Sequence, residues 1–127
     1  MIFLDTSYLI AFFVNREENH ERAVEIAKII KNEEKLISKL VVAETITVLK
    51  KKLETKDIIK IYDTLKDFTT AEDSHLFDNA FEHFIKYDGE ISFFDAVYLA
   101  IMEDFGIHQI ASFDSDFKGK KGIIVIS

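Results

Sequence analysis

The pattern of apolar and polar residues divides the chain into short strands that alternate with helices. Short apolar runs predict five strands, at residues 1–4, 36–38, 68–71, 109–112 and 123–126. Longer stretches predict helices at residues 6–15, 40–53, 55–65 and 92–105. Two more are predicted from residue 19 or 20 through about residue 31, and from residue 73 or 74 through residue 85. This order of elements is typical of an α/β protein.

Three of these helices have apolar residues at helical spacing, which predicts the face that each one buries. For the helix at 20–31 the predicted face is Ala23, Ile26, Ala27 and Ile30. For the helix at 40–53 it is Val42, Ile46, Leu49 and Leu53. For the helix beginning at 73 or 74 it is Leu76, Phe77, Ala80, Phe81, Phe84 and Ile85. The helix that starts at Ser92 is apolar nearly all round, so we expect it to be the most buried, ending in a left-handed Gly106.

Strands that alternate with helices predict a mostly parallel sheet covered on both faces, which is a three-layer α/β fold. With 127 residues, the chain is expected to form a single domain over residues 1–127. In open sheets of this kind, ligands bind at the carboxyl ends of the strands. Asp5 and Asp114 directly follow predicted strands, so the sequence places acidic residues at that edge.

The composition excludes several classes of site. With no cysteine, the chain cannot form disulfides, thiolate nucleophiles, zinc fingers or iron–sulfur ligands. There is no basic leader and no uncharged apolar run of the ~18 residues that a membrane span needs. We therefore expect a cytoplasmic protein with no membrane partner.

The formal net charge of −7 argues against a general nucleic-acid coat, because such proteins are normally basic. It does not argue against a nuclease, since carboxylates of a metal site would contribute to that charge. Lysines gather at positions 50, 51, 52, 56 and 60, and again at 118, 120 and 121. A solvated surface is the ordinary explanation for both groups, although either could contact phosphates.

Five acidic residues lie in unusually apolar surroundings, and they are the candidates for chemistry. They are Asp5, Glu44, Asp95, Asp114 and Asp116. If the fold gathers them, two bare carboxylates ~4 Å apart repel by roughly 4 kcal/mol at an effective dielectric near 20. A divalent metal or shared protons must offset that repulsion, and a metal would favour phosphodiester hydrolysis.

Ordinary structural roles explain the first two acids poorly. Thr6 or Ser7 could cap the helix that follows Asp5, so a capping role would not require Asp5. Glu44 has only Leu40, Val41, Thr47 and Val48 at helical neighbour positions, so no lysine can pair with it along the helix.

The other three acids have stronger competing explanations. Ser92 and Asp95 have the spacing of a capping box, although the rest of that helix through Met102 is uncharged. Asp114 and Asp116 could form an acidic turn, with Lys118 as an ion-pair partner for either. The histidines at 20, 75, 83 and 108 show no ligand spacing, and we assign them no role.

Four segments in this order resemble a PIN domain, and in particular the small VapC-type toxins of prokaryotic toxin–antitoxin pairs. The segments are Leu4–Ile10, Val41–Glu44, Ser92–Ala96 and Ser112–Phe117. Each alone is a weak signal, whereas all four at these spacings are fairly specific, and the resemblance covers the whole chain.

The resemblance implies a three-layer sheet of about five mostly parallel strands and a Mg²⁺- or Mn²⁺-dependent ribonuclease. It further implies a homodimer that a protein antitoxin binds and silences. By position, Asp5, Glu44, Asp95 and Asp114 match the metal-site acids of the family, which would also be the catalytic residues. Asp116 matches an acid that the family has less regularly, and Ser7 and Ser112 match supporting hydroxyls. Threonine is common in the family where this chain has Ser112.

Three other functions stay open at this point. The chain could be an RNA-processing nuclease of the same fold outside any toxin pair, or a catalytically silent binding domain. A phosphate-accepting receiver domain has a similar length and layers, but it needs a lysine after a late strand that this chain lacks. The sequence leaves open whether one or two ions bind.

Overall fold

The structure is a computed structural model that describes residues 1–127. Its strands are β1 (Ile2–Leu4), β2 (Lys35–Ser38), β3 (Thr69–Ala71), β4 (Gln109–Ala111) and β5 (Ile124–Ile126). Its helices are α1 (Thr6–Phe13), α2 (His20–Ile29), α3 (Lys39–Leu49), α4 (Thr55–Leu65), α5 (Phe77–Lys86) and α6 (Phe93–Phe105). Two short 3₁₀ helices, η1 (Ser74–Leu76) and η2 (Ser115–Phe117), complete the chain. Every predicted strand is present, with ends that differ by one residue at most.

All five strands form one parallel sheet in the order β3-β2-β1-β4-β5. The central strand β1 pairs with β2 on one side and with β4 on the other, and its three residues are fully buried. This burial explains why the strand is a continuous apolar run instead of an alternating one. The prediction of a mostly parallel α/β fold is confirmed.

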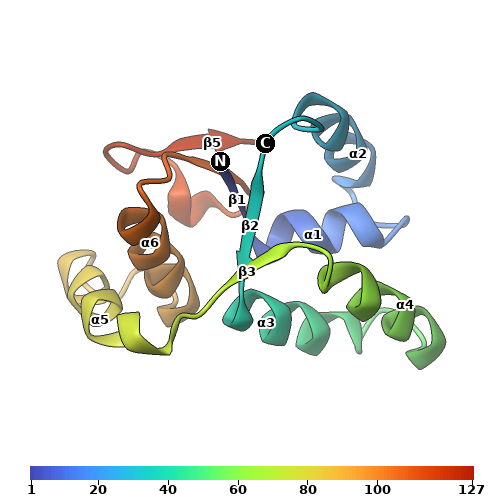
Figure 1. Cartoon of the computed structure of the whole chain (residues 1–127), viewed down its shortest axis with the longest axis horizontal. Coiled ribbons are helices and arrows are strands. Elements are labelled where there is room, and N and C mark those ends of the chain that lie inside the picture. The colour runs from blue at the N-terminus through green and yellow to red at the C-terminus, as the bar shows by residue number, and fades with distance from the viewer.

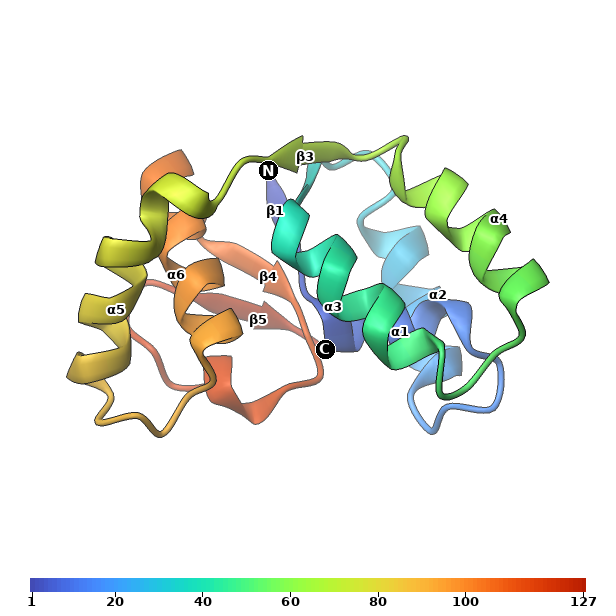
Figure 2. The ribbon, with the colours of Figure 1, turned by 90° about the horizontal axis from the view of Figure 1, so that it is seen from below.

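Helices cover both sides of the sheet. In Figure 1, α5 and α6 lie to the left of the strands and α1 to α4 lie to their right. Figure 2 shows the same division from below, with α5 at the outer left edge and α4 at the outer right edge. The predicted three-layer arrangement is therefore present.

Helix α6 is the most buried helix, as its composition predicts. Its eight residues from Asp95 to Met102 are all buried. Gly106 ends it with φ 65° and ψ 33°, the left-handed conformation that glycine adopts without penalty.

The predicted buried face of α3 is wrong by about one position. The buried residues are Val41, Thr45 and Leu49, whereas Val42 and Ile46 are only half-buried and line a groove beside α4. The error has a physical cause: α3 is apolar on two sides, because one side contacts the sheet and the other contacts α4. A buried Thr45 is tolerated because its hydroxyl donates to Thr6, 3.5 Å away.

The predicted buried face of α5 is also wrong, because three of its six residues are exposed. Ala80 is fully buried, but Phe77, Phe81 and Ile85 are 39%, 53% and 61% exposed. The helix also begins later than expected, at Phe77, after the 3₁₀ turn η1. Because α5 packs mainly against α6, one apolar side of it has no cover within the chain.

Smaller differences concern helix ends. Helix α1 ends at Phe13, two residues before the predicted end. Helix α3 ends at Leu49, and Leu53 packs against the core from the loop that follows. None of the helices combines the length and the apolar character that crossing a membrane requires.

Candidate metal centre

The acidic residues meet at the point where the strand order of the sheet reverses. The chain runs outward from β1 through β2 to β3 and then returns to place β4 on the other side of β1. Asp5 follows β1, and Ser112 and Asp114 follow β4, so they lie together at the carboxyl ends of two neighbouring strands. This position is where open α/β sheets hold their ligands.

Two serine hydroxyls hold the Asp5 carboxylate. Ser7 Oγ donates to Asp5 Oδ2 at 2.6 Å, and Ser112 Oγ donates to the same oxygen at 2.8 Å. The hydroxyls accept in turn from the backbone N–H groups of Phe113 and Asp114, at 2.9 and 3.0 Å. All side-chain bonds to Asp5 use Oδ2, which leaves Oδ1 free of hydrogen bonds.

Asp5 is itself the N-cap of α1, and its Oδ2 also accepts from the backbone N–H of Ser7 at 3.4 Å. The expectation that Thr6 or Ser7 would cap this helix in its place is therefore wrong. The long distance of this bond shows that the two serine hydroxyls are the tighter partners of the carboxylate.

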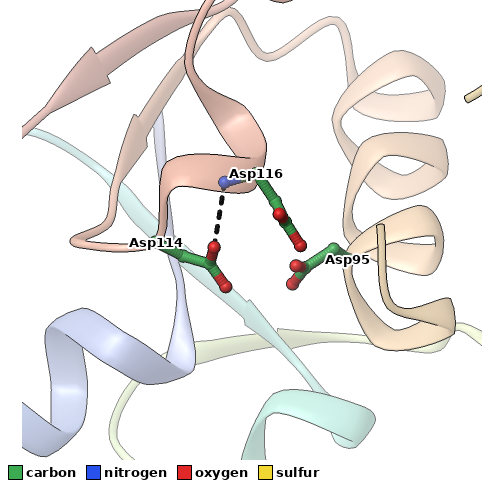
Figure 3. A group of neighbouring side chains, drawn as sticks. All are labelled: Asp95, Asp114 and Asp116. Atoms are coloured by element: carbon green, nitrogen blue, oxygen red, sulfur yellow. Dashed lines mark hydrogen bonds between the residues drawn. The ribbon is translucent and has the colours of Figure 1, made fainter. Parts of the chain in front are cut away.

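Asp95, Asp114 and Asp116 form the tightest part of the cluster. Each offers one carboxylate oxygen, and the three oxygens lie within 4.8 Å of one another. Figure 3 shows Asp95 reaching from α6 toward the other two, which come from the turn after β4. Asp114 Oδ1 accepts from the backbone N–H of Asp116 at 2.9 Å, so this turn has a fixed shape.

The ordinary structural roles predicted for these three acids are only partly present in the structure. Ser92 Oγ accepts from the Asp95 backbone N–H at 3.0 Å, but Asp95 returns no side-chain bond to Ser92, so only half of a capping box forms. Asp114 does cap η2, as an acidic turn would. Lys118, however, pairs with neither Asp114 nor Asp116.

Glu44 reaches the site from α3, and a residue that sequence reasoning missed holds it there. The phenol of Tyr98 donates to Glu44 Oε1 at 2.9 Å. Tyr98 lies on α6, three residues after Asp95, and its side chain is fully buried. The available signal was weak: Tyr98 is the only residue with a hydroxyl between Ala96 and Met102, on the same helix face as Asp95.

One cavity of about 530 Å³ joins all five acids. Its lining includes Asp5, Glu44, Asp95, Asp114 and Asp116, together with Glu17 and Glu18. Lys52 is the one basic residue in the lining, and it is paired with Glu17 at 2.8 Å. None of the five acids forms an ion pair, so the negative charge of the site has no counterion within the chain.

Burial and the uncompensated charge raise the pKa of two of these carboxyl groups. Burial raises the pKa of Asp95 to about 9, helped by the hydrogen bond to Asp116 and by the charges of Asp5 and Asp114. Burial also raises the pKa of Asp5 to about 6, against the opposing hydrogen bonds from Ser7 and Ser112. In the absence of a metal ion, this raised pKa favours the protonated form of Asp95 at neutral pH.

The donor set fits a hard divalent cation. All the ligand atoms are carboxylate oxygens, which Mg²⁺ and Mn²⁺ prefer, and there is no sulfur donor and no imidazole in the cavity lining. Three histidines make other bonds, to the Ala11 carbonyl, to Glu103 and to the Gly122 carbonyl. The cluster has the ligands and the uncompensated charge that such an ion would require.

In a comparison with protein-family models, residues 2–122 match the model of the PIN domain. The chain belongs to the PIN-domain family. The match spans nearly all of the chain and includes all five acids. A search of curated proteins by comparison with this chain finds no match.

Several solved structures share this PIN fold. VapC20 of Mycobacterium tuberculosis, described as a sarcin-ricin loop cleaving toxin, is 25% identical, with a TM-score of 0.82 over 91% of this chain and 92% of that one. A toxin–antitoxin complex from Klebsiella pneumoniae contains a chain that is 19% identical, with a TM-score of 0.74 over 100% and 97%. FitAcB from Neisseria gonorrhoeae is 17% identical, with a TM-score of 0.70 over 100% and 97%.

Proposed function

We propose that this PIN domain is a Mg²⁺- or Mn²⁺-dependent endoribonuclease, acting over residues 1–127 as one domain. The observation that carries the proposal is the group of Asp95, Asp114 and Asp116, whose oxygens lie within 4.8 Å of one another with no basic side chain to neutralise them. Because the repulsion among these carboxylates must be offset by protons or by a cation, binding a divalent cation is a simple use for the group.

The residues proposed to hold the ion are the five cavity acids. Asp95, Asp114 and Asp116 form the centre, and Asp5 and Glu44 line the same cavity with side-chain oxygens free to take part. A bound divalent cation would supply a Lewis acid that activates water and offsets negative charge on a phosphodiester. Ser7 and Ser112 would support the site by fixing Asp5 so that only Oδ1 is free.

The remaining lining of the cavity fits a nucleic-acid strand. Lys52 lies in the same cavity as the acids and could exchange Glu17 for a phosphate. Phe113 presents an aromatic ring beside the acids, and base stacking on such rings is common in single-strand recognition. The activity described for VapC20 of Mycobacterium tuberculosis supports RNA as the substrate class.

We further propose that the chain is the toxin of a toxin–antitoxin pair, which the Klebsiella pneumoniae complex supports. The groove between α3 and α4 offers a surface for a protein antitoxin. Its lining includes the apolar residues Val42, Ile46 and Leu65 and the basic residues Lys39 and Lys66. A homodimer would use the exposed apolar side of α5.

A cleavage assay with a matched variant tests the proposal. Purified protein is incubated with a set of structured and single-stranded RNAs in Mg²⁺, in Mn²⁺ and in EDTA. We expect cleavage only with a cation, and a loss of at least ~100-fold in Asp95→Asn. Replacing a residue that merely supports a metal ligand typically lowers activity by ~10–100-fold, and Asp95 is proposed to bind the ion itself. Asp104→Asn, an exposed acid on the same helix, should cleave like the wild type. Cleavage that persists in EDTA, or at full rate in Asp95→Asn, would refute the metal-dependent mechanism.

A further inference from the structure

The Tyr98 phenol is the only group that binds the Glu44 side chain. It donates to Oε1 at 2.9 Å, and Glu44 has no other side-chain hydrogen bond and no ion pair. The second oxygen, Oε2, is left without a partner. Since Glu44 lines the cavity, this contact decides which of its oxygens is available there.

The contact joins two elements that carry acids of the site. Glu44 lies on α3 and Tyr98 on α6, one turn after Asp95. Glu44 is not one of the three acids within 4.8 Å of one another, so it must be aimed at the ion from a greater distance. A flexible glutamate pays rotamer entropy to hold such a pose, unless another group fixes it.

The surroundings of Tyr98 keep its phenol in the donating role. The ring is fully buried and packs on Phe3, with ring centroids 5.4 Å apart. The Thr6 hydroxyl contacts the phenol oxygen, and Thr45 donates to Thr6 at 3.5 Å. This packing holds the phenol where it donates to Glu44 Oε1.

We propose that Tyr98 is a positioning residue of the metal centre: by binding Oε1, it aims Oε2 of Glu44 into the cavity and so raises the affinity for the divalent cation. This inference rests on the proposed function. Groups that orient a metal ligand in this way commonly change affinity by ~10–100-fold when they are removed.

A double-mutant cycle on Mn²⁺ affinity tests the role of Tyr98 without using catalysis. The free Mn²⁺ signal in electron paramagnetic resonance gives Kd for the wild type, Tyr98→Phe, Glu44→Gln and the double variant. We expect Tyr98→Phe to raise Kd by about tenfold in the wild-type background. In the Glu44→Gln background it should raise Kd by less than about twofold, because Tyr98 acts through Glu44.

Tyr8→Phe is the matched control. Tyr8 is also buried, but its phenol donates to the backbone carbonyl of Ala23 at 3.2 Å and not to an acid. Its loss should leave the Mn²⁺ affinity unchanged. An unchanged Kd in Tyr98→Phe, or an equal increase in both Glu44 backgrounds, would overturn the inference.

A spectroscopic measurement covers the case in which Tyr98→Phe does not fold. Saturating Mg²⁺ should shift the near-UV tyrosine absorption of the wild type and of Tyr8→Phe, and this shift should be absent from Glu44→Gln. A wild type with no shift at saturation would refute the role of Tyr98. If the wild type binds Mn²⁺ but cleaves no RNA, the proposed function fails while the affinity cycle still decides the role of Tyr98.

Discussion

Asp95 shows what it costs the fold to bury an acid beside other acids. Its side chain is 5% exposed and faces two other acids, and its pKa is raised to about 9, chiefly by burial. The folded chain therefore keeps a proton on Asp95 that the unfolded chain, with a pKa near 4, releases. The stabilisation from this proton is complete below pH ~4 and is lost as the pH rises toward 9.

Asp95→Asn should therefore stabilise the metal-free protein in alkaline solution. Asparagine resembles the neutral acid, so the variant escapes the loss that the wild type suffers between pH 4 and 9. In EDTA, we expect its melting temperature to exceed that of the wild type by at least ~5 °C at pH 8.5 and to match it near pH 4. Thermal melts across this range, with Asp104→Asn as control, measure the difference. A variant less stable than the wild type at pH 8.5 would contradict the assigned protonation.

Metal binding should also release a proton from Asp95. A carboxyl ligand must be ionised, and at pH 7.5 Asp95 is protonated while Asp5, with a pKa of about 6, is already mostly ionised. Calorimetry of Mg²⁺ or Mn²⁺ binding in buffers of different ionisation enthalpy should give release of about one proton at pH 7.5. The value should fall toward zero near pH 10 and in Asp95→Asn. Identical heats in all buffers at pH 7.5 would count against this account.

At the residue scale, the sequence reveals acids that lack a nearby cation but does not reveal what binds them. Glu44 could be selected because no lysine lies one turn away along its helix. Tyr98 could not, because its hydroxyl meets Glu44 across 54 positions of sequence, a contact that only the tertiary fold creates. The capping role of Asp5 was considered but set aside, since three consecutive residues could each have capped α1.

Among the elements, strands were predicted closely and helix faces less well. A strand buried on both sides, such as β1, needs only a short apolar run, and the sequence shows that directly. A helix with two apolar sides, such as α3, has no single face for periodicity to find. For α5 the periodicity was clear, but it reported an apolar side that no other element of the chain covers.

The start of α3 depends on two caps from different parts of the chain. Ser38 Oγ accepts from the Val41 backbone N–H at 3.2 Å, and Asp73 Oδ2 accepts from the Leu40 backbone N–H at 2.8 Å. Asp73 follows β3 and is 5% exposed, so its carboxylate ties the edge of the sheet to this helix.

Asp73→Ala should therefore lower the free energy of unfolding by about 1–2 kcal/mol, because it leaves a helix N–H without its acceptor. Asp73→Asn retains a side-chain oxygen and should lose less than half as much. Urea denaturation gives both values. Asp73 lies outside the cavity that holds the acids, so both variants should bind Mn²⁺ with unchanged affinity. Equal stability losses in the two variants would show that the acceptor oxygen is not what matters.

At the scale of the whole molecule, α5 has an exposed apolar side that no other part of the chain covers. Phe77, Phe81 and Ile85 lie four residues apart, so they form one apolar stripe along the helix. Phe94, at the start of α6, is also 39% exposed and adjoins Asp95 in sequence. Figure 2 shows α5 at the outer edge of the molecule, where a second copy could reach it.

Phe81→Glu should convert the proposed homodimer into a monomer, because a charge at the centre of an apolar interface is left desolvated. We expect the dimer Kd to rise at least ~30-fold, which corresponds to the ~2 kcal/mol of an interface hot spot. Ile29→Glu on α2 is the control, since Ile29 is 64% exposed but lies outside this stripe. Sedimentation velocity over a range of concentrations measures both. Because all five acids come from one chain, monomeric Phe81→Glu should bind Mn²⁺ as tightly as the wild type. A wild type that stays monomeric, or equal dissociation in the two variants, would remove α5 as the dimer surface and leave the metal centre unaffected.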